Sequence, residues 1–162
     1  MKKQLTLFIF FFATISLFAQ ENWNQQIDAK LSEVISSHRT FVSIPNLPSD
    51  IQKMYKNVAW VKEHYSKVGF ELKTLESSTL PVLFAERIIN PAFKTILFYF
   101  HLDGQAVNLE SWDQKDPFQP VLKEQNEAGQ WDEIAWSRAD EKMKDDWRIF
   151  GRAAADDKAP II

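Results

Sequence analysis

The residues best suited to chemistry are His101 and Asp103, which directly follow the apolar run TILFYF at residues 95–100. A continuous apolar run of this length predicts a strand buried on both faces, and side-chain alternation would place His101 and Asp103 on the same side. Ligands of open α/β sheets bind beyond the carboxyl ends of strands. A neutral imidazole there suits zinc, and a nearby carboxylate could orient it. The simpler alternative is a histidine that only bonds to a loop.

A second group of carboxylates follows a second short strand. The sequence GRAAADDK at residues 151–158 comes after WRIF at 147–150. Adjacent residues point in different directions, so we expect only one of Asp156 and Asp157 to face the crevice. Two carboxylates so close together repel unless a cation lies beside them. The alternative is a solvated helix start, where acidic residues are favoured by the helix dipole.

Periodicity predicts the elements that position these residues. Apolar residues spaced three and four apart predict an amphipathic helix over residues 23–42, which Pro45 and Pro48 end. A capping box from Ser49 to Gln52 starts a second helix that runs to Gly69. Strands are expected within residues 70–77, 81–89, 95–100, 118–124 and 147–150, and a solvated loop with partial helix at 126–146. This order predicts an α/β fold with helices packed on a sheet.

Composition and the N-terminus restrict the class of protein. The net charge of −3 and the lack of a basic stripe argue against a nucleic-acid partner. The chain contains no cysteine, so a thiolate nucleophile or cysteine metal site is excluded. Lys2 and Lys3 precede an apolar run from Leu5 to Phe18, which predicts a signal peptide at residues 1–19 and an exported, periplasmic or secreted protein from residue 20. The run is shorter than the roughly 20 residues of a membrane span, so no stable membrane anchor is expected.

The motifs FHLDGQ and GRAAADDK, in this order and roughly fifty residues apart, resemble the N-terminal motifs of a di-zinc metallopeptidase family. This family includes carnosinase, aminoacylase, glutamate carboxypeptidase and acetylornithine deacetylase. Three further stretches resemble the family in the same order, namely FVSIPNLPSD, WVKEHYSKVGFELKTLES and SWDQKDPFQPVLKE. The resemblance therefore covers nearly all of residues 20–162.

The resemblance implies a three-layer α/β/α catalytic domain with a mixed sheet. His101 would bind one zinc, Asp156 would bridge two zincs, and Asp103 would be the catalytic residue that orients His101. Cobalt or manganese would suit the same ligands. A metal-bound water would attack a short peptide or an N-acyl amino acid. The implied activity is that of a dipeptidase or a carboxypeptidase.

The family's other site residues have no counterpart in this sequence. The family supplies a general base from a Glu-Glu pair and further ligands from a later acidic residue and a late histidine. No Glu-Glu pair occurs in the chain, and the other histidines are His38 and His64. We expect a core or capping role for His38 and a surface position for His64. The sequence is thus expected to be the N-terminal portion of the domain, incomplete at residue 162 and inactive alone, with any homodimer limited to the full-length protein.

Alanine replaces the family's usual glycine at Ala153 and Ala159, so a positive φ at either site would be strained. Two alternatives to the enzyme remain open. One is a non-catalytic remnant with exposed apolar surface. The other is a secreted peptide- or sugar-binding module that stacks ligands on exposed tryptophans, of which Trp112, Trp131, Trp136 and Trp147 are the candidates, although tryptophans more often pack a core or anchor a loop.

Overall fold

The structure is a computed structural model that describes residues 23–141 and 143–162. The predicted signal peptide at 1–19 lies outside the described residues. The chain divides into two compact units at the boundary between Ile35 and Ser36, and the packing described below lies within the unit Ser36–Ile162. Among the described residues, no helix combines the length and the apolar character needed to cross a membrane.

Two helices open the described chain, as predicted. Residues 23–42 form the first helix, and α2 spans Ile51–Lys67. The predicted capping box is displaced by one residue, because the Asp50 side chain caps α2 by accepting a hydrogen bond from the Lys53 backbone N–H. Asp50 supplies a carboxylate where Ser49 has only a hydroxyl, which suits the positive end of the helix dipole. Gly69 follows α2 with φ +86°, the left-handed conformation that glycine adopts without strain.

A small aromatic core joins the first helix to α2. Phe41 is fully buried and stacks on Trp60 with ring centroids 4.1 Å apart. Val61 and Ile161 complete the buried cluster, and the Tyr65 hydroxyl donates to the Ile161 carbonyl at 2.9 Å. This last contact attaches the short 3₁₀ helix Ala159–Ile161 to α2. The C-terminal segment that carries Asp156 and Asp157 is therefore held by the core.

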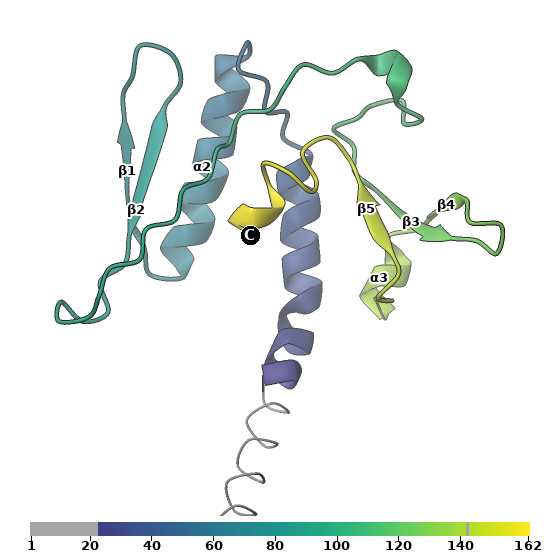
Figure 1. Cartoon of the computed structure of the whole chain (residues 1–162), viewed down its shortest axis with the longest axis horizontal. Helices are drawn as coiled ribbons and strands as arrows, with labels where there is room; N and C mark the ends of the chain where they lie inside the picture. Colours follow the sequence, from purple (N-terminus) through teal and green to yellow (C-terminus); the bar gives the residue numbers. More distant parts are fainter. Residues whose placement is uncertain (1–22, 142) are drawn as a thin grey trace, which may run out of the picture. The chain divides into compact units, whose positions relative to one another are not determined.

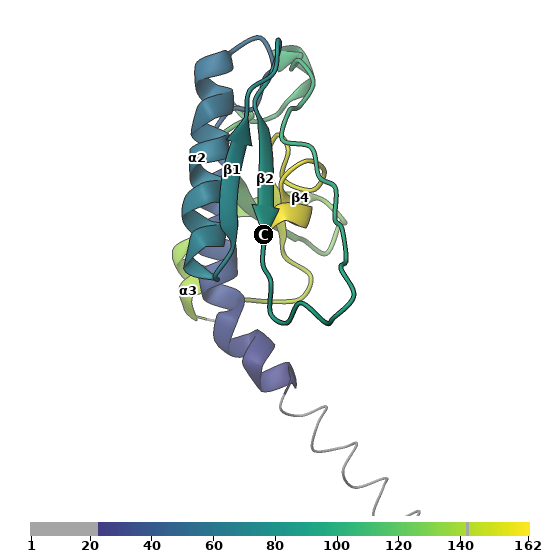
Figure 2. The same cartoon turned by 90° about the vertical axis from the view of Figure 1, so that its left-hand side faces the viewer.

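The strands form two small antiparallel sheets. Strands β1 (Glu71–Leu75) and β2 (Val82–Glu86) form a hairpin that lies against α2 (Figures 1 and 2). The second sheet has the order β4-β3-β5, with β3 at Val121–Gln125, β4 at Trp131–Ile134 and β5 at Arg148–Phe150. A short helix, α3 (Ser137–Glu141), follows β4, and a 3₁₀ turn spans Leu109–Ser111. The α/β class is confirmed, whereas the three-layer arrangement and the mixed sheet stay predictions.

The segment 126–146 contains more regular structure than its polar sequence indicated. The partial helix is confirmed as α3, but strand β4 was missed. β4 pairs with β3 through a tight turn in which the Asn126 side chain accepts from the backbone N–H groups of Ala128 and Gln130. Gly129 has φ +79° in this turn. A four-residue strand is too short for alternation to reveal, whereas the Asn and Gly of its turn were the available signal.

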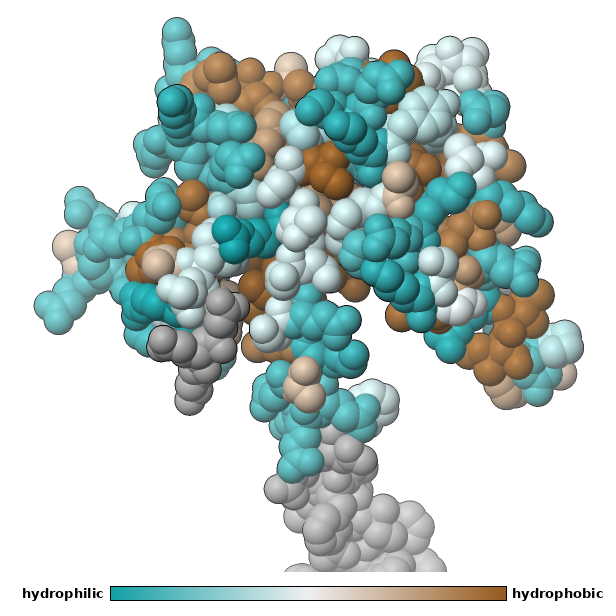
Figure 3. Space-filling view, turned by 180° about the vertical axis from the view of Figure 1, so that it is seen from behind, coloured by the Kyte–Doolittle hydropathy of each residue, from teal (hydrophilic) through white to brown (hydrophobic). Residues whose placement is uncertain are grey.

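The prediction of a buried central strand at residues 95–100 is wrong within the described structure. These residues belong to no strand ladder, and the segment runs as an open trace after β2 (Figure 2). Ile96, Leu97 and Tyr99 are 75%, 85% and 86% exposed. Val82 and Phe84 of β2, and Ile88 and Ile89 after it, are exposed as well. Figure 3, which views the molecule from behind, shows hydrophobic surface at its lower right. The apolar side chains of residues 95–100 would gain free energy from burial, but no described element covers them.

Candidate metal centre

The segment 101–104 is anchored to the loop that follows the first helix. The Gly104 backbone N–H donates to the Asn46 carbonyl at 2.8 Å, and the Asn46 side chain donates from Nδ2 to the Leu102 carbonyl at 2.9 Å. These two bonds fix the backbone on both sides of Asp103. The histidine motif is therefore positioned by a loop about 56 residues earlier in the chain.

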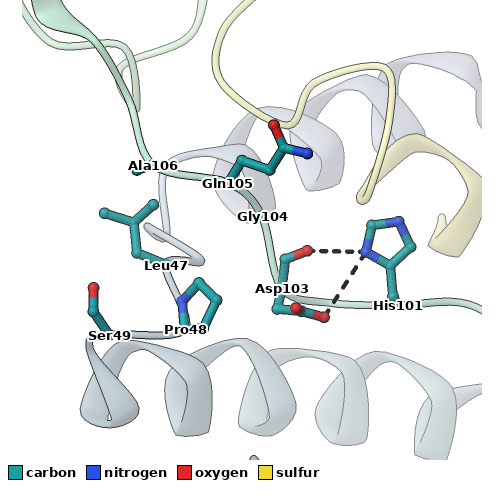
Figure 4. A pocket seen from close by; sticks show the side chains of 8 residues that line it. All are labelled: Leu47, Pro48, Ser49, His101, Asp103, Gly104, Gln105 and Ala106. Atoms are coloured by element: carbon teal, nitrogen blue, oxygen red, sulfur yellow. Dashed lines mark hydrogen bonds and ion pairs between the residues drawn. The ribbon is translucent and has the colours of Figure 1, made fainter.

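The His101 ring is oriented by the backbone of Asp103. Nδ1 lies 2.9 Å from the Asp103 carbonyl oxygen and 3.9 Å from its carboxylate Oδ1, as the dashed lines in Figure 4 mark. A carbonyl can only accept, so Nδ1 carries the proton and Nε2 of the neutral ring keeps a lone pair for a ligand. The bond to the Asp103 carbonyl raises the pKa of His101, assisted by the negative charges of Asp157, Asp103 and Asp156. The sequence predicted that the Asp103 carboxylate orients His101. In the structure the Asp103 carbonyl makes the closer contact, and the carboxylate lies farther away.

His101 Nε2 faces both aspartates of the second motif. It lies 3.3 Å from Asp157 Oδ1 and 3.8 Å from Asp156 Oδ1, and the three ligand atoms all lie within 4.8 Å of one another. Two ligands of a tetrahedral zinc with bonds of 2.0–2.1 Å are about 3.3 Å apart. One imidazole nitrogen and two carboxylate oxygens form a zinc-type donor set, in which the His101–Asp157 pair has this separation and the His101–Asp156 pair is wider. Among the described residues, this is the only group of three or more such side chains.

The two aspartates differ sharply in environment. The Asp157 side chain is 5% exposed and that of Asp156 is 90% exposed. Sequence reasoning expected one carboxylate to face the site and selected Asp156, yet both approach His101. Asp157 has φ +67°, which turns the chain between the two carboxylates. Asp157 is therefore a third candidate ligand, whose proximity to His101 depends on a backbone conformation that aspartate adopts uncommonly.

The loop 151–157 also carries the strain anticipated at Ala153. Ala153 has φ +66°, a left-handed conformation that costs an L-residue roughly 1–2 kcal/mol. Ala159 instead begins the 3₁₀ helix and has no positive φ. A strained positive φ, predicted where alanine replaces glycine, is therefore confirmed at Ala153 and is not found at Ala159. Other contacts must hold the loop in this conformation.

His38 makes one of the contacts that hold the loop 151–157. Its Nε2 lies 2.8 Å from the Ala154 carbonyl, so the ring donates to the strained loop. Burial lowers the pKa of His38, partly offset by that bond. The predicted core or capping role of His38 is confirmed. His64, for which a surface position was predicted, is partly exposed, and its ring stacks on Trp60 with centroids 3.6 Å apart.

Two buried polar residues near the site escaped the sequence reasoning. Asn46 is fully buried and donates from Nδ2 to Asp157 Oδ2 at 3.1 Å. Lys158 is also fully buried, and this burial lowers its pKa to about 7. Nothing around Asn46 distinguishes it from an ordinary loop asparagine, because it bonds to residues 56 and 111 positions away, and Lys158 bonds to one 117 positions away. For Lys158, the two acidic residues directly before it were the one sequence feature that could have indicated a buried charge.

An open cavity of about 600 Å³ adjoins His101 and Asp103. Leu47, Pro48 and Ser49 line one side, and residues 103–106 line the other (Figure 4). The wall combines an apolar surface with a hydroxyl, a carboxylate and the Gln105 amide. A cavity next to the metal-ligand cluster gives a bound molecule access to it.

Of the four tryptophans proposed as a binding surface, two make structural hydrogen bonds and the other two are only partly exposed. Trp147 is 5% exposed and donates to Glu124 Oε2 at 3.1 Å, and Trp136 donates to the Pro120 carbonyl at 3.2 Å. Trp112 is partly buried, and Trp131 is 38% exposed. The expectation that tryptophans pack a core or anchor loops is confirmed for Trp147 and Trp136. No tryptophan lines the cavity beside His101.

Comparison with known proteins agrees with the metal chemistry of this site. The chain is 26% identical over 149 residues to the Cys-Gly metallodipeptidase dug1 of Schizosaccharomyces pombe, a match that covers 84% of this chain and 27% of the relative. No family model and no solved structure matches the chain. The chain thus spans about a quarter of that relative's length. Its sequence is similar to the corresponding part of a metallodipeptidase, a hydrolase that uses a metal, and the cluster of His101, Asp156 and Asp157 is the place where the described residues could hold one.

Proposed function

We propose that these residues form the N-terminal part of the catalytic domain of an exported, zinc-dependent peptidase of dipeptidase or carboxypeptidase type. The single observation that carries the proposal is the spacing of His101 Nε2 from the two aspartate oxygens, 3.3 and 3.8 Å, at the motifs that resemble the family. Similarity to a metallodipeptidase over most of the chain supports it independently. The proposed substrates are short peptides or N-acyl amino acids.

A bound zinc ion would supply a polarised water and a Lewis acid for attack on the amide carbonyl. The chain's own residues prepare the site for it. The Asp103 carbonyl holds the proton of His101 on Nδ1, which leaves the Nε2 lone pair directed at the aspartates. Asp156 is open to solvent, so its second oxygen is available to another ligand or ion, in keeping with the bridging role we propose for it. The adjacent cavity would receive the substrate.

The described donor set contains one histidine and two aspartates, which is sufficient for one metal ion with three protein ligands. We therefore propose that the 162-residue chain binds a single divalent ion but does not turn over substrate alone. The general base and the ligands of a second ion would come from the remainder of the protein, and so would any dimer interface.

Isothermal titration of the whole chain with Zn²⁺, followed by hydrolysis assays on Cys-Gly and on N-acetyl amino acids, tests this proposal. We expect binding of one Zn²⁺ per chain and no turnover by the chain alone. Sequencing of the gene beyond codon 162 should then reveal a Glu-Glu pair and a late histidine in frame. Absence of Zn²⁺ binding would contradict the proposed metal centre. Export is tested separately, by N-terminal sequencing of the mature protein for a start near residue 20.

A non-catalytic remnant is the second candidate, favoured by the exposed apolar residues at 95–100. This alternative predicts binding of a hydrophobic dye, unfolding without a cooperative transition, and no affinity for Zn²⁺. Cooperative unfolding together with stoichiometric Zn²⁺ binding would exclude it.

A further inference from the structure

We propose that Asn46 and Lys158 form a buried clamp that holds the Asp157 carboxylate at ligand distance from His101. In this proposal both are positioning residues, and the inference rests on the metal centre proposed above. Three segments far apart in the sequence meet at the clamp: the loop after the first helix, residues 102–104, and residues 157–158. None of the three candidate ligands lies on the loop that carries Asn46, so in the clamp this loop acts by holding the other two segments in place.

Asn46 connects the two motifs directly. Its Nδ2 uses one proton for the Leu102 carbonyl at 2.9 Å and the other for Asp157 Oδ2 at 3.1 Å. Its backbone carbonyl accepts from Gly104 at 2.8 Å. The residue is fully buried, so these bonds do not compete with water. One side chain therefore sets the position of the histidine segment relative to the aspartate segment.

The Asn46–Asp157 contact divides the two carboxylate oxygens between different tasks. Oδ2 is bonded to Asn46, whereas Oδ1 lies 3.3 Å from His101 Nε2. A carboxylate with one oxygen fixed by a hydrogen bond can offer only the other to a metal in a defined direction. Removing a residue that hydrogen-bonds to a metal ligand commonly lowers metal affinity 10- to 100-fold.

Gly104 makes the close approach possible. A Cβ at this position would lie 2.8 Å from Asp157 Oδ2 and 2.9 Å from Asn46 Nδ2. Its φ is not in the left-handed region, so alanine would meet a steric obstacle and no backbone strain. The glycine of the histidine motif therefore leaves space for the clamp.

Lys158 holds the other side of the clamp. Its Nζ donates to the carbonyl of Phe41, at 2.6 Å in the last turn of the first helix, and to that of Ile44, just beyond the end of that helix. The end of a helix leaves carbonyls unpaired and carries a partial negative charge, which an ammonium group satisfies. The ammonium also lies 4.5 Å from the centroid of the Phe41 ring. Because Lys158 follows Asp157 directly, this anchor limits the movement of the carboxylate.

The test combines Co²⁺ titration, followed by visible absorption, with amide exchange in the metal-free whole chain. Gly104→Ala and Asn46→Ala should each weaken Co²⁺ binding roughly tenfold or more and alter the Co²⁺ spectrum. Asn126→Ala is the matched control, because it removes a side-chain amide whose bonds hold the 126–130 turn. It should leave Co²⁺ affinity unchanged while it lowers thermal stability. Lys158→Met should also weaken Co²⁺ binding, whereas its control Lys123→Met, at a buried lysine in β3, should not.

The outcomes separate the clamp from the proposed function. Wild-type affinity for Co²⁺ in both Gly104→Ala and Asn46→Ala would overturn the clamp and leave the metal centre intact. If the wild-type chain binds no Co²⁺, the proposed function fails, and amide exchange still decides the clamp. In that measurement the Asn46 side-chain amide should exchange at least tenfold more slowly than that of Asn126, and Gly104→Ala should remove the difference. Equal exchange of the two amides in the wild-type chain would refute the clamp. If Asn46→Ala does not fold, Gly104→Ala carries the test, since it removes no hydrogen-bonding group.

Discussion

Residues 95–100 and residues 101–104 are neighbours in the sequence but have opposite environments. The first segment is apolar, with Leu97 and Tyr99 more than four-fifths exposed, and it belongs to no strand ladder. The second is polar, yet Gly104 is buried and the backbone is bonded to Asn46 on both sides of Asp103. Hydrophobic burial gains free energy only where another surface is available to cover the side chain. Directed hydrogen bonds from one buried residue are enough to fix a short segment.

The largest difference between the two regions should appear on truncation of their side chains. Phe41→Ala removes the fully buried ring that stacks on Trp60 beside the clamp, and it should lower the free energy of unfolding by about 3–5 kcal/mol. Leu97→Ala removes a side chain that is 85% exposed, and the change should stay within about 0.5 kcal/mol. Urea unfolding followed by circular dichroism measures both. A loss of several kcal/mol for Leu97→Ala would mean that residues 95–100 are buried in solution, and the comparison would fail.

A smaller effect is expected in the pH dependence of stability, through His38, which bonds to the loop next to the aspartates. Burial places the pKa of His38 below that of the unfolded chain, and the charge of Lys158 lowers it further. The unfolded state therefore binds the proton more readily, so stability is complete above the unfolded pKa of about 6.5 and falls as pH drops toward the folded pKa. His38→Gln should flatten this dependence between pH 8 and pH 5. It should also cost about 1 kcal/mol at pH 8 through the lost bond to Ala154.

Thermal unfolding of wild type and His38→Gln across that pH range checks the prediction. Tyr99→Ser is the control from the exposed segment, and its pH dependence should match that of the wild type. A loss of stability between pH 8 and pH 5 that is as large in His38→Gln as in the wild type would contradict the burial of a neutral His38.

The smallest effect concerns solubility of the exposed segment. Leu97→Lys places a charge in the middle of the apolar run without removing a packed side chain. It should reduce aggregation on heating while the unfolding midpoint shifts by no more than about 1 °C, because isolated surface changes seldom alter stability. Light scattering and circular dichroism, recorded during the same thermal ramp, separate the two quantities. An unchanged onset of aggregation would show that this segment does not govern association.

The sequence predicted what depends on local pattern. Helical spacing found the first helix and α2, and short apolar runs found β1, β2, β3 and β5. At residues 95–100 the same pattern reasoning failed, since an apolar run indicates a need for burial and does not identify the covering element. His101, Asp103 and Asp156 were predicted from motifs, and the structure places both carboxylates within 4 Å of the His101 ring nitrogens.

Asp157, Asn46 and Lys158 were missed for a tertiary reason. Asn46 bonds to residues 56 and 111 positions away and Lys158 to one 117 positions away, so neither periodicity nor a local motif could indicate their burial. For Asp157, we expected its side chain to point away from that of Asp156, as neighbouring side chains do in an extended or helical backbone. Its φ of +67° lies outside both, and therefore the two carboxylates approach the same imidazole.

The central claim is that His101, Asp156 and Asp157 bind one divalent metal ion. Its most direct test is ¹⁵N NMR of the whole chain labelled at histidine, during titration with Zn²⁺. Of the three histidines, His38 and His64 are internal controls, since they are bonded to the carbonyls of Ala154 and Trp60. We predict that the Nε2 resonance of His101 alone shifts and saturates at one Zn²⁺ per chain, and that Asp157→Asn weakens binding on the order of tenfold or more. An unmoved His101 resonance, or an equal response from His38 or His64, would contradict the account.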